Sequence, residues 1–206
     1  MSKFVITEPL VRKLLATVDV GLSHGLGVPE PGQMCVEAAI SYALGEPHSD
    51  GPSCVDPMVR SAKIRLNDAP WSGPIARARG MRAVAIAQLG SKGTIDAVKF
   101  VTLLAEYVIR EVVPIALRAA AAVNPSHAAA LEASAARCQQ DGDAAAADAA
   151  NAAAYAANAA ADAAKAAANE KDRLLSLCAS LMVRALKECG SPGCEWLWLL
   201  DEMPVS

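Results

Sequence analysis

An alanine-rich segment between residues 144 and 168 constrains the fold of this chain more than any other feature. Alanine occupies 19 of its 25 positions, and the six exceptions recur at spacings of 3, 4, 3, 4 and 3. These exceptions are Asp148, Asn151, Tyr155, Asn158, Asp162 and Lys165. Alanine has the highest helix propensity, and a repeat of about 3.5 residues keeps the polar side chains on one narrow stripe. The segment therefore predicts a long helix whose circumference is mostly methyl groups.

We expect this helix to run from Asp143 to Cys189, because larger apolar residues continue the helical period beyond the alanine segment. That second half, which includes Leu181 and Leu186, is expected to dock on the rest of the chain. Small side chains let helix backbones approach closely, so the alanine half is interpreted as an assembly surface that carries the six polar residues. The alternative interpretation is a solitary helical spacer.

Turn-forming residues divide the preceding chain into shorter helices. Thr7 and Asp56 each stand just before a proline-containing helix start, as capping residues do. The expected helices begin near Glu8 and cover 33–44, 57–67, 75–89, a long stretch capped by Thr94, and 127–140. Pro114 is expected to kink or break the long one. No stretch alternates as a strand does, so the fold class predicted is all-α.

Two segments carry specific packing expectations. The long helix after Thr94 should bury one side, made of Val98, Val101, Leu104, Ala105, Val108, Ile109 and Val112. The apolar C-terminal tail holds two of the three tryptophans, Trp196 and Trp198, which we expect to pack in the core. The predicted organisation is a compact helical head over 1–140, the long alanine-rich helix over 141–190, and the tail over 191–206.

Composition indicates the cellular compartment in which we expect the protein. The hydrophobic fraction is 53%, but much of it is alanine, and no run of large apolar residues is long enough to cross a membrane. Glu8 and Pro9 interrupt the first residues where a signal peptide would be apolar. We therefore expect a cytoplasmic protein, without membrane association, whose six cysteines are free thiols.

Basic residues concentrate between residues 57 and 92. This segment has a formal charge of +6 while the rest of the chain sums to -9. The candidate phosphate-binding residues are Arg60, Lys63, Arg65, Arg77, Arg79 and Arg82. Two adjoining basic helices suit nucleic-acid binding by charge neutralisation. The alternative is a basic surface that complements the acidic remainder, within one chain or between subunits.

The densest polar cluster surrounds the second predicted helix. In one interpretation Cys35, near a helix N-terminus, is a thiol nucleophile of lowered pKa, with His48 or His24 as its base and Gln33 stabilising an oxyanion. In another, Cys35, His48 and Cys54 bind zinc with Glu37 or Asp50 as fourth ligand, although the spacing matches no standard zinc pattern. The structural interpretation has both cysteines as buried packing residues and Glu37 bonded to the loop backbone.

Several short stretches also resemble a known group of sequences. They are Gln33-Met34-Cys35-Val36-Glu37-Ala38-Ala39, Gly45-Glu46-Pro47-His48-Ser49-Asp50, Pro52-Ser53-Cys54 and Leu66-Asn67-Asp68. Together they resemble a signature of uncharacterised bacterial and phage-borne proteins, many of which carry alanine-rich segments. The resemblance implies one unitary fold and brings no activity with it.

These features favour a non-enzymatic helical protein that self-associates or binds a protein partner through its alanine-rich helix. The expected state is a homo-oligomer with no cofactor and no resident metal. Nucleic-acid binding through residues 57–92 is the first alternative. A cysteine-dependent or zinc-dependent enzyme centred on Cys35, His48 and Cys54 is the second.

Overall fold

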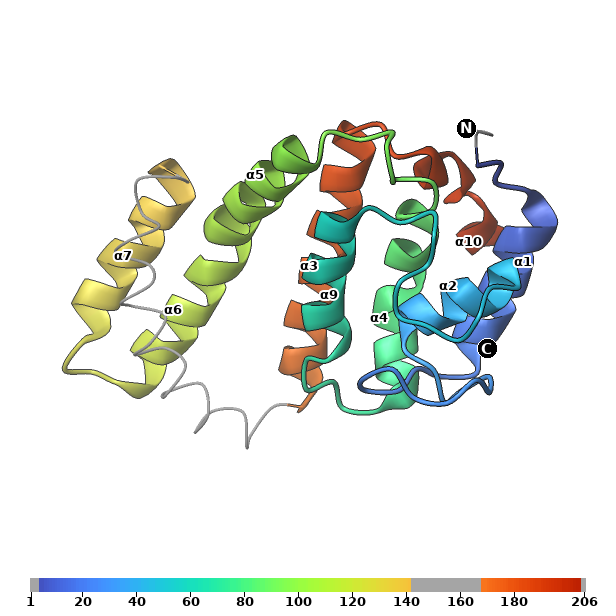
Figure 1. Ribbon diagram of the computed structural model, residues 1–206. Coiled ribbons are helices and arrows are strands. Elements are labelled where there is room, and N and C mark those ends of the chain that lie inside the picture. Colours follow the sequence, from blue (N-terminus) through green and yellow to red (C-terminus); the bar gives the residue numbers. More distant parts are fainter. Residues whose placement is uncertain (1–3, 142–167, 205–206) are drawn as a thin grey trace. The chain divides into compact units, whose positions relative to one another are not determined.

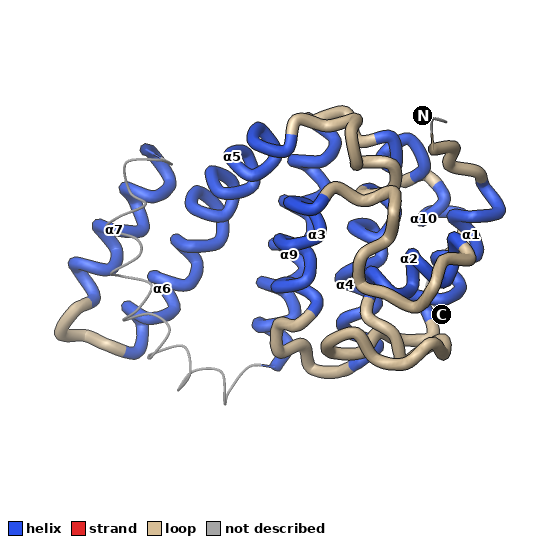
Figure 2. The backbone as a smooth tube through the Cα atoms, in the orientation of Figure 1, coloured by secondary structure: helices blue, strands red, loops and turns tan. Residues whose placement is uncertain are grey.

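The structure, a computed structural model, describes residues 4–141 and 168–204 of the chain (Figure 1). Helices connected by loops make up this described part, which contains no strand beyond one isolated bridge between Gly27 and Met34 (Figure 2). The predicted all-α class is therefore confirmed. The chain divides into two compact units, residues 1–101 with 175–206, and residues 102–174. The head predicted over 1–140 is thus distributed over both units.

The alanine-rich stripe from Asp148 to Lys165 lies outside the described residues. What is described of the predicted long helix is α9 (Ala168–Glu188). Its C-terminal apolar residues, including Leu181 and Leu186, are buried as expected. One very long helix is not shown, and the longest helical run in the described ranges spans 97–123.

Four helices form the first unit together with the end of the chain: α1 (Glu8–Asp19), α2 (Val36–Leu44), α3 (Pro57–Asn67) and α4 (Pro74–Ala87). Asp56 caps α3 as predicted, because its Oδ1 accepts the Met58 amide at 2.8 Å. Thr7 occupies the N-cap position of α1, but its side chain makes no capping hydrogen bond. The apolar sequence of α2 is buried, and its one acidic residue, Glu37, is buried with it.

The C-terminal tail packs on the end of α4 through its backbone. It contains η2 (Pro192–Trp196) and α10 (Leu199–Glu202). The Gly193 amide donates to Leu89 O at 3.0 Å, and a Cβ atom at Gly193 would lie 2.0 Å from Ile86 O. Close backbone contact therefore requires glycine here.

The tryptophans do not follow the prediction. Trp198 is 45% exposed and stacks on Trp196 with the ring centroids 6.4 Å apart, so core packing is wrong for Trp198. The buried indole is Trp71, in the loop between α3 and α4, and it is only 7% exposed.

Helix α5 (Ala97–Tyr107) crosses from the first unit into the second and continues through η1 (Val108–Val112) into α6 (Val113–Val123). Asp96, rather than Thr94, caps α5, since Asp96 Oδ1 accepts the Lys99 amide at 3.0 Å. Pro114 neither breaks nor ends the helix. The turn before it widens to a π-helix, in which the Val113 amide bonds Val108 O, and the proline sits in the first turn of α6.

The predicted buried side of α5 and η1 is only partly buried: Leu104, Val108, Ile109 and Val112 are half-buried, and the other three residues are exposed. Val98 is 76% exposed, Val101 is 37% exposed and Ala105 is also exposed, while Phe100 is fully buried in their place. An apolar periodicity fixes which residues share a helix face but not whether another element covers that face.

The second unit contains a helical hairpin of α6 and α7 (Ala128–Asp141), which pack along each other (Figure 1). Its core consists of Leu117, Ala120, Ala121, Leu131, Ala135 and Cys138. Three of these six residues are alanine, so small side chains form part of the contact between the two helices.

Candidate functional site

A buried ion pair joins α2 to α3. Lys63 Nζ lies 2.7 Å from Glu37 Oε1, and both side chains are 0% exposed. Apart from this contact, Lys63 Nζ and Glu37 Oε2 have no further hydrogen-bond partner within the described chain. Burying an ion pair costs more free energy than a single contact returns unless the remaining donors and acceptors are satisfied. The pair is therefore an unusual feature for a position inside a small helical unit.

A small cavity of about 80 Å³ adjoins this pair. Its polar lining comes from Cys35, Asp50, Lys63, Asn67 and Asp68. Asp68 Oδ1 accepts the Gly25 amide at 2.8 Å and the Asn67 amide nitrogen Nδ2 at 2.8 Å, which fixes the carboxylate on the cavity wall. The cavity thus brings together an amine, a thiol and two carboxylates.

Burial controls the protonation of these groups. Desolvation lowers the pKa of Lys63 and raises the pKa of Glu37, and in both cases the charge of the other residue opposes the shift only in part. Desolvation likewise raises the pKa of the Cys35 thiol, although the Ala38 amide and Lys63 act in the opposite direction. The pair is thereby shifted toward a neutral amine beside a neutral carboxylic acid.

The predicted cysteine nucleophile does not have the expected environment. Cys35 is the N-cap of α2, and its Sγ accepts the Ala38 amide at 3.4 Å, as the helix position predicts. Its pKa is nevertheless raised and not lowered, because burial outweighs the helix N-terminus. Gln33 is exposed and donates to Glu30, away from any oxyanion near the thiol.

The predicted zinc ligands are not gathered into one site. Cys35 lines the small cavity, Cys54 lines a separate larger one, and His48 Nε2 lies 3.1 Å from Gly27 O. Across residues 4–141 and 168–204, no group of three or more His, Cys, Asp or Glu side chains is placed to hold a metal ion. The expectation that Glu37 bonds the loop backbone is also wrong, since Glu37 pairs with Lys63.

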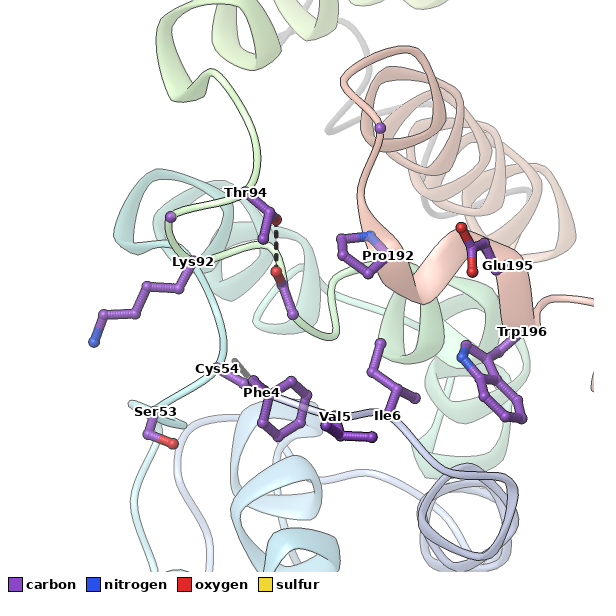
Figure 3. Close-up of a pocket in the computed structure, with 13 residues that line it drawn as sticks. Phe4, Val5, Ile6, Ser53, Cys54, Lys92, Thr94, Pro192, Glu195 and Trp196 are labelled. Carbon is purple, nitrogen blue, oxygen red and sulfur yellow. Dashed lines mark hydrogen bonds between the residues drawn. The ribbon is translucent and has the colours of Figure 1, made fainter. Parts of the chain in front are cut away.

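A larger cavity of about 1190 Å³ opens between the N-terminal segment, the loop after α4 and the C-terminal tail (Figure 3). Phe4, Ile6 and Trp196 supply an apolar wall, and Lys92 and Glu195 supply charges at its edge (Figure 3). The Thr94 hydroxyl donates to Gly90 O at 2.6 Å, which fixes the loop. Burial raises the pKa of Cys54, at the floor of this cavity, to about 11, so the thiol stays protonated at neutral pH.

Most of the basic residues of segment 57–92 hold the fold together. Arg77 is 7% exposed and donates to two backbone oxygens, Asn67 O at 2.7 Å and Leu22 O at 2.8 Å. Arg82 is 6% exposed, forms an ion pair with Asp19 at 2.6 Å and donates to Met203 O.

The other four candidate phosphate-binding residues include two that form ion pairs and two that are exposed. Lys63 is buried with Glu37, and Arg60 pairs with Asp50 at 2.6 Å. Of the six candidate phosphate-binding residues, Arg65 and Arg79 are exposed. The formal charge of +6 is therefore distributed mostly into the interior and into ion pairs, and does not form one basic surface.

Comparisons of the chain with protein-family models, with curated proteins and with solved structures found no match in any of the three. The geometry of the chain's own residues is accordingly the basis for every functional statement that follows. In the described ranges, no helix combines the length and apolar character needed to cross a membrane.

Sequence reasoning identified two of the five polar residues that line the small cavity, Cys35 and Asp50, together with Glu37, which pairs with Lys63 but does not line the cavity. Cys35, Glu37 and Asp50 were singled out as a polar cluster, and a lone glutamate in an apolar helix was the visible signal. Lys63 and Asp68 were missed because they belong to α3 and its end, where Lys63 is one of several basic residues with the same local pattern. Only the packing of α3 against α2 distinguishes Lys63 from them.

Proposed function

We infer that this protein is a non-enzymatic interaction protein that self-associates through apolar and alanine-rich helix faces. The observation that carries the proposal is the exposed face of α5, formed by Val98, Val101 and Ala105. These residues lie three and four positions apart, so they share one side of the helix. Large apolar side chains that adjoin one another on a surface mark sites of protein contact.

The hairpin of α6 and α7 supports the choice of a helical partner. Its core shows that alanine faces of this chain pack helix against helix. The sequence predicts a further face of the same composition in the alanine-rich segment that contains Asp148 to Lys165. A second copy of the chain supplies a partner whose faces match in composition, and symmetric pairing is the commonest form of self-association.

The two alternatives have weaker support. Nucleic-acid binding was predicted from six basic residues, four of which are buried or paired inside the fold. Because Arg77 and Arg82 tie elements together, their substitution would unfold the protein and so could not test the idea. The exposed Arg65 and Lys92 are the appropriate probes, and loss of salt-dependent binding on changing both to Ala would be the supporting result.

The proposal is tested by light scattering after size-exclusion chromatography of the full chain, with absorbance recorded at 260 and 280 nm. We expect an oligomer free of nucleic acid that shifts toward the monomer when Val98→Lys and Val101→Lys are combined. Val20→Lys is the matched control, because Val20 is 55% exposed at the end of α1 and lies on another element. A wild-type monomer at high micromolar concentration, or an oligomer that the double variant leaves intact, would refute the proposal.

A further inference from the structure

The exposed apolar strip of α5, formed by Val98, Val101 and Ala105, is flanked by two opposite charges. Lys99 and Glu106 are seven residues apart, so they leave the helix on one flank, within about 20° of each other. The strip therefore has a cation beside its N-terminal half and an anion beside its C-terminal half.

Both charged side chains are accessible to a partner chain. Lys99 is exposed, and its Nζ donates to Glu188 O at 3.2 Å, one bond for an ammonium that carries three donors. The Glu106 side chain is 42% exposed, and its Oε1 accepts from Arg110 Nε at 2.9 Å. Since a carboxylate accepts at both oxygens, this contact leaves Glu106 able to bind a second cation.

The strip also changes in size along its length. Its N-terminal end is Val98, which is 76% exposed, and its C-terminal end is the methyl group of Ala105. Two parallel copies would place valine against valine at one end and alanine against alanine at the other, so the ends could not pack equally closely. Two antiparallel copies place each valine against an alanine, which packs without a gap.

The flanking charges favour the same direction. In a parallel pair Lys99 would face Lys99 of the second copy, and Glu106 would face Glu106. In an antiparallel pair each Lys99 faces a Glu106, so two attractive contacts replace two repulsive ones. Charged residues beside a helix–helix interface commonly set the orientation of the partners in this way.

We propose that α5 pairs antiparallel with α5 of a second copy, in a register centred between Val101 and Thr102. This inference rests on the self-association proposed above, and it adds the partner element, its direction and its register. In this register Val98 of each copy lies level with Ala105 of the other. Lys99 is then offset from Glu106 of the second copy by only about 3 Å along the helix axis, within reach of both side chains.

Charge reversal in the full-length protein tests the direction. Sedimentation would give the dimer dissociation constant for Lys99→Glu, for Glu106→Lys and for the two combined. We expect each single variant to raise the constant about tenfold, because both inter-chain contacts become repulsive, and the combination to restore it. Lys92→Glu is the matched control, since Lys92 is exposed outside α5 and its substitution should change nothing.

The outcomes separate this inference from the proposed function. Parallel pairing predicts that neither single variant weakens the dimer, because like charges already face each other. Such a result, or a folded combined variant that does not recover, would overturn the antiparallel register while leaving self-association intact. A wild-type monomer would remove both proposals.

Disulfide cross-linking tests the register. Positions 98 and 105 of one helix are about 10 Å apart along its axis, beyond the reach of about 7 Å between bridged Cα atoms, so a disulfide between them must join two chains. In the variant that combines Val98→Cys and Ala105→Cys, we expect oxidation to give a covalent dimer whose peptide map contains the bridge between positions 98 and 105. A bridge between two positions 98, or from position 98 to a native cysteine of the same chain, would overturn the proposal.

Discussion

Gly80 is the single residue where a helix-stabilising substitution should act in reverse. Glycine inside a helix ordinarily costs about 1 kcal/mol relative to alanine, so Gly80→Ala in α4 would be expected to stabilise. A Cβ atom at this position, however, would lie 2.2 Å from the Trp71 ring. Trp71 cannot move away freely, because it is buried and its Nε1 donates to Leu66 O at 2.9 Å. We expect Gly80→Ala to lower the free energy of unfolding by about 1–3 kcal/mol in urea denaturation.

Gly73→Ala is the matched control for this prediction. Gly73 precedes α4, has an extended backbone with φ of 176°, and a Cβ atom there would meet nothing within 4 Å. Its substitution should change the midpoint little. Equal effects of the two variants would show that the Trp71 contact does not determine the stability at Gly80.

Asp68 predicts a pH dependence of stability. Burial acts to raise the pKa of Asp68, but hydrogen bonds from the Gly25 amide and from Asn67 outweigh it, and the net pKa is lowered. A carboxyl whose folded pKa lies below its unfolded value contributes stability above the unfolded pKa, about 3.9, and loses it as pH falls through the folded pKa. The difference in unfolding free energy between wild type and Asp68→Asn should therefore be largest near pH 6 and shrink below about pH 4. A pH-independent difference would contradict this.

The sequence showed which charged residues are unusual, but it did not show which residues they pair with. The lone glutamate of α2 was visible in the sequence, whereas its partner Lys63 was grouped with the basic residues of segment 57–92. Arg82 and Asp19 are likewise 63 positions apart. Local sequence gives the charge and periodicity of a residue, but ion pairs across the fold depend on how the helices pack.

In the α6–α7 hairpin, we expect the core to accept only a small side chain at position 135. Ala135 is 0% exposed at the interface of the two helices, so Ala135→Leu inserts three carbon atoms where methyl groups meet. We expect a destabilisation of about 1–3 kcal/mol, visible as faster hydrogen exchange in residues 113–141. Ala136→Leu is the matched control, because Ala136 is the next residue of α7 and is exposed. Equal protection in the two variants would refute the size limit.

The helix start at Pro57 and the helix end at Gly45 were predicted correctly, whereas the helix predicted over 75–89 ends at Ala87. The effect of Pro114 was predicted poorly, because a proline inside a helix has two possible structural consequences. Pro114 removes a hydrogen-bond donor, and a helix accommodates this either by breaking or by widening one turn. The π-helix at Val108–Val112 is the second outcome, and the helix continues beyond it as α6.

The chain divides into two compact units, and this division was not visible in the sequence. The predicted division placed all of residues 1–140 in one head, because a chain of 206 residues is long enough for one sizeable domain with a helical extension. The structure instead divides the chain within α5 and within α9. Continuous helices hide such a boundary, since their local pattern does not change where one core ends and another begins.

We expect the two compact units to unfold in separate steps. Leu15 in α1 and Leu117 in α6 are both 0% exposed, one in each unit, and truncation of either to alanine should cost about 2–5 kcal/mol. We expect Leu15→Ala to accelerate hydrogen exchange throughout α1, α2 and α4 while leaving α7 unchanged, and Leu117→Ala to do the opposite. Since each variant removes the same three side-chain carbon atoms, each is the control for the other. If both variants accelerated exchange equally in all helices, the chain would unfold as one cooperative unit, which would contradict this prediction.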